Sequence, residues 1–96
     1  MDIYQQIEEK RERILQIAHK HGAGKVRLIG SVARREAGRD SDIDLLVELE
    51  PDRTLLDHAA LVEELQALLG VKVDVASDRG LRQRIKTQVL AEAVPL

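Results

Sequence analysis

The sequence has no cysteine and a single aromatic side chain, Tyr4. Without cysteine it can form neither a disulfide nor a thiolate metal site, and its core must be built from aliphatic side chains. Its longest apolar run is far shorter than the roughly 20 residues that cross a membrane, and its charged, helix-like N-terminus does not resemble a signal peptide. From these absences we expect a cytoplasmic protein with no membrane association.

The composition that remains is that of an ordinary globular protein. Of the 96 residues, 44% are hydrophobic and 33% are charged, and the net charge is −2. This length predicts one domain over residues 1–96. A domain of this size is often only modestly stable alone, so an oligomer or a bound partner is compatible with it. The negative net charge argues against direct binding of nucleic acid.

Periodicity and turn residues predict helices that alternate with strands. We expect helices over residues 2–20, about 54–69 and about 81–91, a helical turn over 32–36, and strands over 25–29, 43–49 and 71–75. Gly22 and Gly24 should end the first helix, and Asp52 or Thr54 should cap the long one. A helix connects the last two strands, so these can lie parallel through a right-handed crossover, whereas the first two can pair in either direction. The predicted fold class is α/β (α+β), a small mixed β-sheet of about three strands flanked by about four helices.

Asp42 and Asp44 stand two residues apart at the start of the predicted strand 43–49. Side chains at this spacing on a strand point to the same side, roughly 7 Å apart. Two carboxylates placed there repel each other unless a cation lies between them, and hard oxygen ligands suit Mg²⁺ or Mn²⁺. The alternative is that this face is open to solvent and the pair binds no metal.

Asp74 lies between two valines in a strand that we expect near the centre of the sheet. If that strand lies beside residues 43–49, Asp74 can share the face of Asp42 and Asp44. A cluster of three carboxylates is typical of the two-metal sites that transfer phosphoryl and nucleotidyl groups. The alternative is an exposed aspartate on an edge strand.

Gly30 and Ser31 come directly after the predicted strand 25–29. Glycine lets the backbone approach a ligand closely, and the serine hydroxyl together with the N–H groups of the following turn suits a phosphate. The segment is not a Walker loop, because no Gly-Lys-Ser/Thr follows. A Gly-Ser pair alone is usually just a turn, but one followed eleven residues later by Asp42-Ile43-Asp44 is much more specific.

The stretch from Gly30 to Val47, GSVARREAGRDSDIDLLV, closely resembles the signature of the DNA polymerase β-like nucleotidyltransferases. It is most similar to the minimal branch of that family, the MNT proteins, and the resemblance covers nearly the whole chain. Its specific part is residues 30–47 together with Val73-Asp74-Val75. The resemblance implies the polymerase β-like fold and a Mg²⁺-dependent nucleotidyltransferase.

The resemblance also implies a role for each matching residue. Asp42 and Asp44 would bind the metal ions, two Mg²⁺, that also hold the triphosphate of ATP. Asp74 would complete the metal site and help to deprotonate the attacking hydroxyl. Gly30 and Ser31 would hold the β- and γ-phosphates.

Two arginines of the same stretch are open to different interpretations. Arg34 follows the family pattern and is a candidate for binding the nucleotide, and the alternative is a surface ion pair with Glu36 or Asp40. Arg35 stands where members of the family commonly carry glycine. Arg35 is not one of the predicted metal ligands. The family pattern therefore does not predict the geometry of this loop or how the acceptor reaches the site.

Minimal members of this family are typically antitoxins, paired with a helical HEPN-domain toxin. The resemblance therefore implies transfer of AMP from ATP to a hydroxyl, that of a tyrosine, on such a toxin. The alternative is a non-catalytic antitoxin that neutralises its partner by stoichiometric binding. Transfer to a small molecule is less favoured, because 96 residues leave no room for a second domain to shape its pocket.

Overall fold

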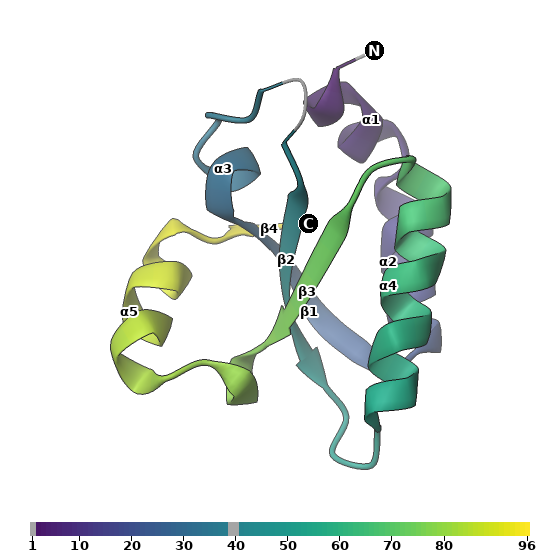
Figure 1. The fold of residues 1–96 in the computed structure, drawn as a ribbon, viewed down its shortest axis with the longest axis vertical. Coiled ribbons are helices and arrows are strands. Elements are labelled where there is room, and N and C mark those ends of the chain that lie inside the picture. The colour runs from purple at the N-terminus through teal and green to yellow at the C-terminus, as the bar shows by residue number, and fades with distance from the viewer. Residues whose placement is uncertain (1, 39–40) are drawn as a thin grey trace.

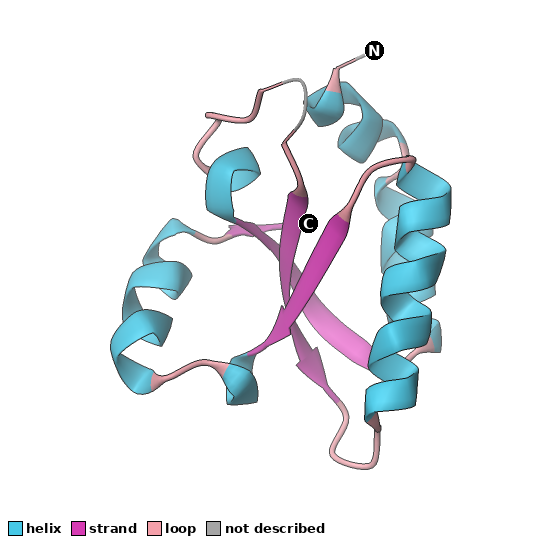
Figure 2. Cartoon of the chain, in the orientation of Figure 1, coloured by secondary structure: helices cyan, strands magenta, loops and turns pink. Residues whose placement is uncertain are grey.

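The computed structural model describes residues 2–38 and 41–96, and Figure 2 marks their helices and strands. Along the chain they form α1 (Ile3–Glu9), α2 (Arg11–Lys20), β1 (Ala23–Ile29), α3 (Gly30–Ala33), β2 (Ile43–Leu49), α4 (Leu55–Leu69), β3 (Val73–Ser77), the 3₁₀ turn η1 (Asp78–Gly80), α5 (Gln83–Glu92) and β4 (Val94–Pro95). The strands form one sheet in the order β3-β2-β1-β4. Figure 1 shows α1, α2 and α4 on one side of the sheet and α3 and α5 on the other. The predicted α+β class with a mixed sheet is confirmed, with one strand more than expected.

The predicted helix over 2–20 is divided at Lys10 into α1 and α2, so its prediction as one element is wrong. Both Gln6 and Lys10 reach the end of α4. Gln6 Nε2 donates to the carbonyl oxygen of Leu69 at 2.6 Å, and Lys10 Nζ donates to that of Leu68 at 2.9 Å. The bend therefore lets α1 satisfy carbonyl groups that have no partner within α4.

β1 begins two residues before the predicted strand, at Ala23. Gly22 follows the last turn of α2 with a φ of 79°, as a helix stop should. Gly24 lies inside the strand, so its predicted role as a second helix stop is wrong. The pairing with β2 shifts between Gly24 and Arg27, and Lys25 has a φ of 46°. Such a bulge adds a residue to one strand. It interrupts the alternation of apolar and polar residues from which the start of β1 could have been predicted.

β3 is an edge strand, and the expectation that the strand of Asp74 lies near the sheet centre is wrong. Its pairing with β2 is parallel, as the crossover through α4 predicted, whereas β1 and β2 are antiparallel. The strand covers Val73–Ser77 rather than residues 71–75. Gly70 ends α4 in the left-handed conformation with a φ of 71°, and two more residues bring the chain into the sheet.

The C-terminal part contains two elements that the sequence did not predict. These are η1 and the two-residue strand β4, in which Val94 pairs with Leu28 and Pro95 pairs with Arg27. A two-residue strand is too short to show an alternation of apolar and polar residues. The helix α5 covers Gln83–Glu92, close to the expected 81–91.

The long helix α4 begins and ends as its sequence indicates. Thr54 caps it, and Thr54 and Asp57 form a capping box. Leu61, Leu65 and Leu69 of α4 are buried, whereas Leu55 and Leu56 of its first turn are 85% and 82% exposed. The buried face of the helix thus begins at Leu61, six residues after its first residue.

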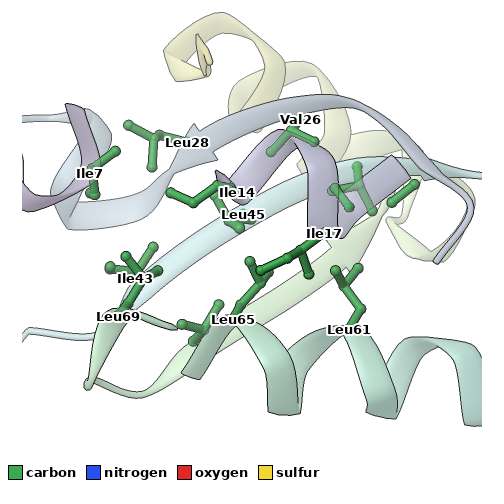
Figure 3. Packing of buried hydrophobic residues seen from close by; sticks show 14 of the residues in the cluster. Ile7, Ile14, Ile17, Val26, Leu28, Ile43, Leu45, Leu61, Leu65 and Leu69 are labelled. Atoms are coloured by element: carbon green, nitrogen blue, oxygen red, sulfur yellow. The ribbon is translucent and has the colours of Figure 1, made fainter. Parts of the chain in front are cut away.

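The core is aliphatic and lies between the sheet and the layer of α1, α2 and α4 (Figure 3). Ile43, Leu45 and Val47 of β2 contribute to it from one face of the strand. The opposite face of β2 is left for Asp42 and Asp44, as the alternation predicts. Within residues 2–38 and 41–96, no helix is both long enough and apolar enough to cross a membrane.

Candidate active site

Asp44 lies at the centre of a row of three residues that crosses the sheet. It pairs with Ile29 of β1 on one side and with Asp74 of β3 on the other. Residues paired across neighbouring strands point to the same face, and Asp42, two positions before Asp44, points there too. The sheet therefore brings the three predicted carboxylates to one face.

The electrostatics of Asp44 reflect this grouping. Burial raises the pKa of its carboxyl, and the neighbouring carboxylates of Asp74 and Asp42 raise it further, Asp74 by both charge and a hydrogen bond. Lys72 acts in the opposite direction, and its Nζ atom is 3.8 Å from Oδ2 of Asp42. The site therefore concentrates negative charge. Of the groups that shift the pKa of Asp44, Lys72 is the one that lowers it.

Gly30 borders this carboxylate directly. Its φ is 70°, and a Cβ atom at this position would lie 2.5 Å from Oδ2 of Asp44. The absence of a side chain thus makes room for Asp44. Gly30 and Ser31 begin α3, which starts two residues earlier than the predicted helical turn 32–36. The turn therefore places Gly30 next to the carboxylate of Asp44, and Ser31 follows it at the start of α3.

The structure gives Arg34 carboxylate partners. Its Nε atom donates to Glu36 at 3.1 Å, and a terminal nitrogen donates to Glu92 of α5 at 3.4 Å. The hydrogen bond that Arg34 donates to Glu36 is the largest of the effects that raise the pKa of Arg34. The predicted alternative, an ion pair with Glu36, is therefore present, while Asp40 lies outside the described residues. A nucleotide-binding role of Arg34 stays a prediction.

Arg35 is the residue that departs from the family pattern, and its backbone explains why glycine suits this position. Its φ of 61° lies in the left-handed region, which glycine adopts without strain. The guanidinium of Arg35 lies 4.8 Å from the centre of the Tyr4 ring, within range of a cation–π contact. The Tyr4 hydroxyl also accepts a hydrogen bond from the N–H of Ala37 at 3.0 Å. Tyr4 therefore holds the loop that leads away from α3.

A divalent cation fits the chemistry of the three aspartates. Their donors are all carboxylate oxygens, the ligands that Mg²⁺ and Mn²⁺ prefer, and a cation would relieve the repulsion that raises the pKa of Asp44. In the described parts of the chain, no three acidic or histidine side chains are already arranged as a metal cage. The metal-binding role of Asp42, Asp44 and Asp74 remains a prediction.

Three polar residues around the site were not singled out as site residues from the sequence. Arg27 of β1 forms an ion pair with Asp78 at 2.7 Å, and each side chain is only 16% exposed. Two α4 side chains, His58 and Gln66, bond to the backbone of β3. Each of these contacts joins residues of two different elements, so the pattern within one element does not predict it.

Comparison with known proteins decides the family. A profile of the nucleotidyltransferase domain matches residues 6–95. The chain belongs to this family. The predicted enzyme class is thereby confirmed, and the site described above lies within the matched segment of this nucleotidyltransferase.

Similar proteins agree with the predicted minimal branch. Protein adenylyltransferase MntA of Thermococcus cleftensis is 38% identical over 79 residues, which are 82% of this chain and 80% of that protein. A solved structure provisionally described as a minimal nucleotidyltransferase has a TM-score of 0.90 and 54% identity, over 100% of this chain and 97% of that one. A crystal structure of a toxin–antitoxin with AMP-PNP has a TM-score of 0.76 and 21% identity, over 88% of this chain and 69% of that one. The last similarity shows a shared fold only.

Proposed function

We propose that this nucleotidyltransferase transfers AMP from ATP to a hydroxyl, that of a tyrosine, on a HEPN-domain toxin, and so acts as an antitoxin in the cytoplasm. The observation that carries the proposal is that Asp44 pairs with Asp74 across β2 and β3 and also lies beside Gly30, which has no side chain. The similarity to a protein adenylyltransferase supports AMP as the transferred group and a protein as the acceptor. The shared fold with a chain of a toxin–antitoxin bound to AMP-PNP supports the choice of partner and nucleotide.

In this proposal each residue of the site has one task. Asp42, Asp44 and Asp74 hold Mg²⁺, and Gly30 with Ser31 contacts the β- and γ-phosphates. When bound, Mg²⁺ supplies positive charge that stabilises the phosphate oxygens during transfer. Asp74, the most exposed of the three, takes the proton of the acceptor hydroxyl.

The reaction then balances as a single substitution at phosphorus. The hydroxyl oxygen of the acceptor forms a bond to the α-phosphorus of ATP, and the bond from that phosphorus to the oxygen bridging the β-phosphate breaks. Pyrophosphate leaves with the bonding electron pair, and the proton of the hydroxyl goes to the Asp74 carboxylate. Because little covalent chemistry falls to the protein, positioning and electrostatics carry most of the catalysis.

The test combines the purified protein with Mg²⁺, ATP labelled on the α-phosphate, and the toxin encoded beside its gene. We expect label on the toxin, at a tyrosine identified by mass spectrometry. Asp42→Asn with Asp44→Asn should abolish labelling, while Asp52→Asn, on the exposed turn before α4, should not. A folded toxin that stays unlabelled with the parent protein would contradict the proposal.

The same double variant separates catalysis from stoichiometric binding. The exposed Leu55 and Leu56 at the start of α4 give the chain an apolar surface that such binding could use. If toxin neutralisation survives the loss of Asp42 and Asp44, binding is sufficient. If neutralisation disappears while the circular dichroism spectrum is unchanged, the transfer of AMP is required.

A further inference from the structure

The strand that carries Asp74 is held by the sheet on one side only. β3 is five residues long, lies at the edge of the sheet and pairs with β2 alone. Edge strands have backbone groups without a strand partner and open more readily than central ones. The position of the Asp74 carboxylate opposite Asp44 therefore depends on the contacts that hold the outer edge of β3.

The ladder shows which groups of β3 face outward. The carbonyl oxygen of Lys72 accepts from the N–H of Ile43 at 3.0 Å, so Lys72 directs its backbone toward β2. In a parallel pair, alternate residues of a strand face the same neighbour. The backbone groups of Val73 and Val75, on either side of Asp74, consequently face the open edge.

Two side chains of α4 occupy this edge. Oε1 of Gln66 accepts from the N–H of Val73 at 3.1 Å, and Nε2 of His58 is 2.7 Å from the carbonyl oxygen of Val75. A carbonyl can only accept, so Nε2 of His58 carries the hydrogen. The two residues are eight positions apart on one helix, and steps of four residues keep them on the same flank.

The helix that supplies these side chains is itself fixed. Leu61, Leu65 and Leu69 of α4 are each no more than 2% exposed and belong to the core. A hollow of about 480 Å³ is lined by residues of this flank of α4 and of β3, among them His58, Gln66 and Asp74. The two side chains bond to the outward backbone groups of β3, where a neighbouring strand would otherwise bond.

We propose that His58 and Gln66 are positioning residues for Asp74. They fix the residue before Asp74 through its N–H and the residue after it through its carbonyl, and thereby hold the Asp74 carboxylate opposite Asp44. This assignment rests on the proposed function, in which Asp74 binds the metal and accepts the proton. Neither side chain touches the nucleotide or the metal in this assignment.

The test uses changes that remove or keep one hydrogen-bonding atom. Gln66→Leu removes the acceptor, Gln66→Glu keeps an acceptor oxygen, and His58→Phe removes the donor. Gln16→Leu, on the exposed face of α2, makes the same chemical change elsewhere and serves as the control. Circular dichroism of each full-length variant checks that it is folded.

The first measurement is hydrogen exchange at the Val73 amide, which needs neither metal nor partner. Loss of a hydrogen bond of ordinary net strength should speed exchange about fivefold in Gln66→Leu. Gln66→Glu and Gln16→Leu should exchange like the parent. Unchanged exchange in Gln66→Leu would overturn the proposal.

The second measurement is Mn²⁺ affinity together with the kinetics of AMP transfer. Misplacing a catalytic group by a fraction of an ångström costs on the order of tenfold or more in rate. We expect that loss in kcat for Gln66→Leu and His58→Phe, with weaker Mn²⁺ binding. The KM for ATP should stay within about twofold, since the phosphates contact other elements. Gln66→Glu should restore kcat, which a general loss of stability would not explain.

Asp74→Asn distinguishes a failure of the positioning role of His58 and Gln66 from a failure of the proposed function. If it is inactive while Gln66→Leu and His58→Phe keep the parental kcat and Mn²⁺ affinity, the positioning role is wrong and the proposed function stands. If Asp74→Asn is itself fully active, the catalytic role of Asp74 is wrong and the positioning role falls with it.

Discussion

Gly30 and Asp44 share a space that holds only one side chain. A Cβ atom on Gly30 would lie 2.5 Å from Oδ2 of Asp44, and the φ of 70° is strained for any other residue. We expect Gly30→Ala to lower stability by more than the roughly 1–2 kcal/mol of left-handed strain alone, and to reduce AMP transfer by on the order of a hundredfold through displacement of Asp44. Thermal unfolding and the transfer assay measure the two effects.

Gly70 and Gly24 serve as controls that separate backbone strain from the steric contact with Asp44. Gly70 has a φ of 71° but open space around a would-be Cβ, so Gly70→Ala should show the strain and keep the activity. Gly24 has neither the positive φ nor a close neighbour, and Gly24→Ala should change little. If Gly30→Ala were as stable and as active as Gly70→Ala, the claim that a side chain at position 30 displaces Asp44 would be wrong.

Asp44→Asn should stabilise the metal-free protein. Burial and the charges of Asp74 and Asp42 raise the pKa of Asp44 in the folded state above its unfolded value. A carboxyl shifted in this direction lowers stability once the pH exceeds its unfolded pKa, because the folded state resists its ionisation. We expect a gain of a few tenths to about 1 kcal/mol at pH 7 after solvent screening, measured by urea unfolding in EDTA.

That gain should depend on pH in a defined direction. As the pH falls through the raised pKa of Asp44 and then below its unfolded value, the carboxyl becomes protonated first in the folded and then in the unfolded state, and the parent and Asp44→Asn should converge. Asp52→Asn, on an exposed turn, serves as the control. A less stable Asp44→Asn at neutral pH without metal would show that repulsion does not dominate at this site.

Glu64 should give the opposite dependence on pH. Hydrogen bonds from Lys20, at 2.6 Å, and from His21, at 3.0 Å, hold its pKa below the ordinary value. A lowered carboxyl pKa contributes stability above the unfolded pKa, and this contribution is lost as the pH falls through the folded pKa. Glu64→Gln should therefore unfold at a lower temperature than the parent at pH 7.

The control for Glu64 is its neighbour Glu63, which is exposed on the same helix. Glu63→Gln should change the unfolding temperature less than Glu64→Gln does at pH 7. As the pH falls through the lowered pKa of Glu64, so that the carboxyl becomes protonated in the folded state as well, the difference between Glu64→Gln and the parent should shrink. A difference that stays constant from pH 7 to pH 3 would assign the effect of Glu64 to packing rather than charge.

Arg35→Gly and Arg35→Ala should differ although both remove the guanidinium. Each loses the contact with the Tyr4 ring, worth about 0.5–1 kcal/mol at an exposed site. Only glycine also relieves the left-handed backbone at a φ of 61°, a gain of about 1 kcal/mol. We expect Arg35→Gly to be near neutral and Arg35→Ala to be the least stable of the three proteins in thermal unfolding. Equal stability of the two variants would argue against the strain.

Much of the site could be predicted because its parts are local in sequence. The alternation in β2 places Asp42 and Asp44 on the face opposite Ile43 and Leu45, since the period of a strand is two residues. Gly30 follows a strand directly, where a positive φ is common in a tight turn. Such signals span a few residues and need no knowledge of the rest of the fold.

What could not be predicted depends on contacts between distant segments. Nothing near Asp74 indicates that its strand lies at the edge, because the order of strands is decided by how the whole chain packs. Gln66 and His58 look like ordinary polar residues of an amphipathic helix until the position of β3 is known. The break at Lys10 likewise coincides with a bond from its side chain to Leu68, 58 residues away.

The parallel pairing of β2 with β3 has a consequence for the order in which the protein matures. Asp42 and Asp44 leave the ribosome about thirty residues before Asp74, and the whole of α4 lies between the two strands that align. A nascent or clipped chain that stops short of β3 would carry the glycine turn, Asp42 and Asp44, but not Asp74, the proposed proton acceptor. With the role proposed for Asp74, enzymatic competence is a late event in the synthesis of this polypeptide.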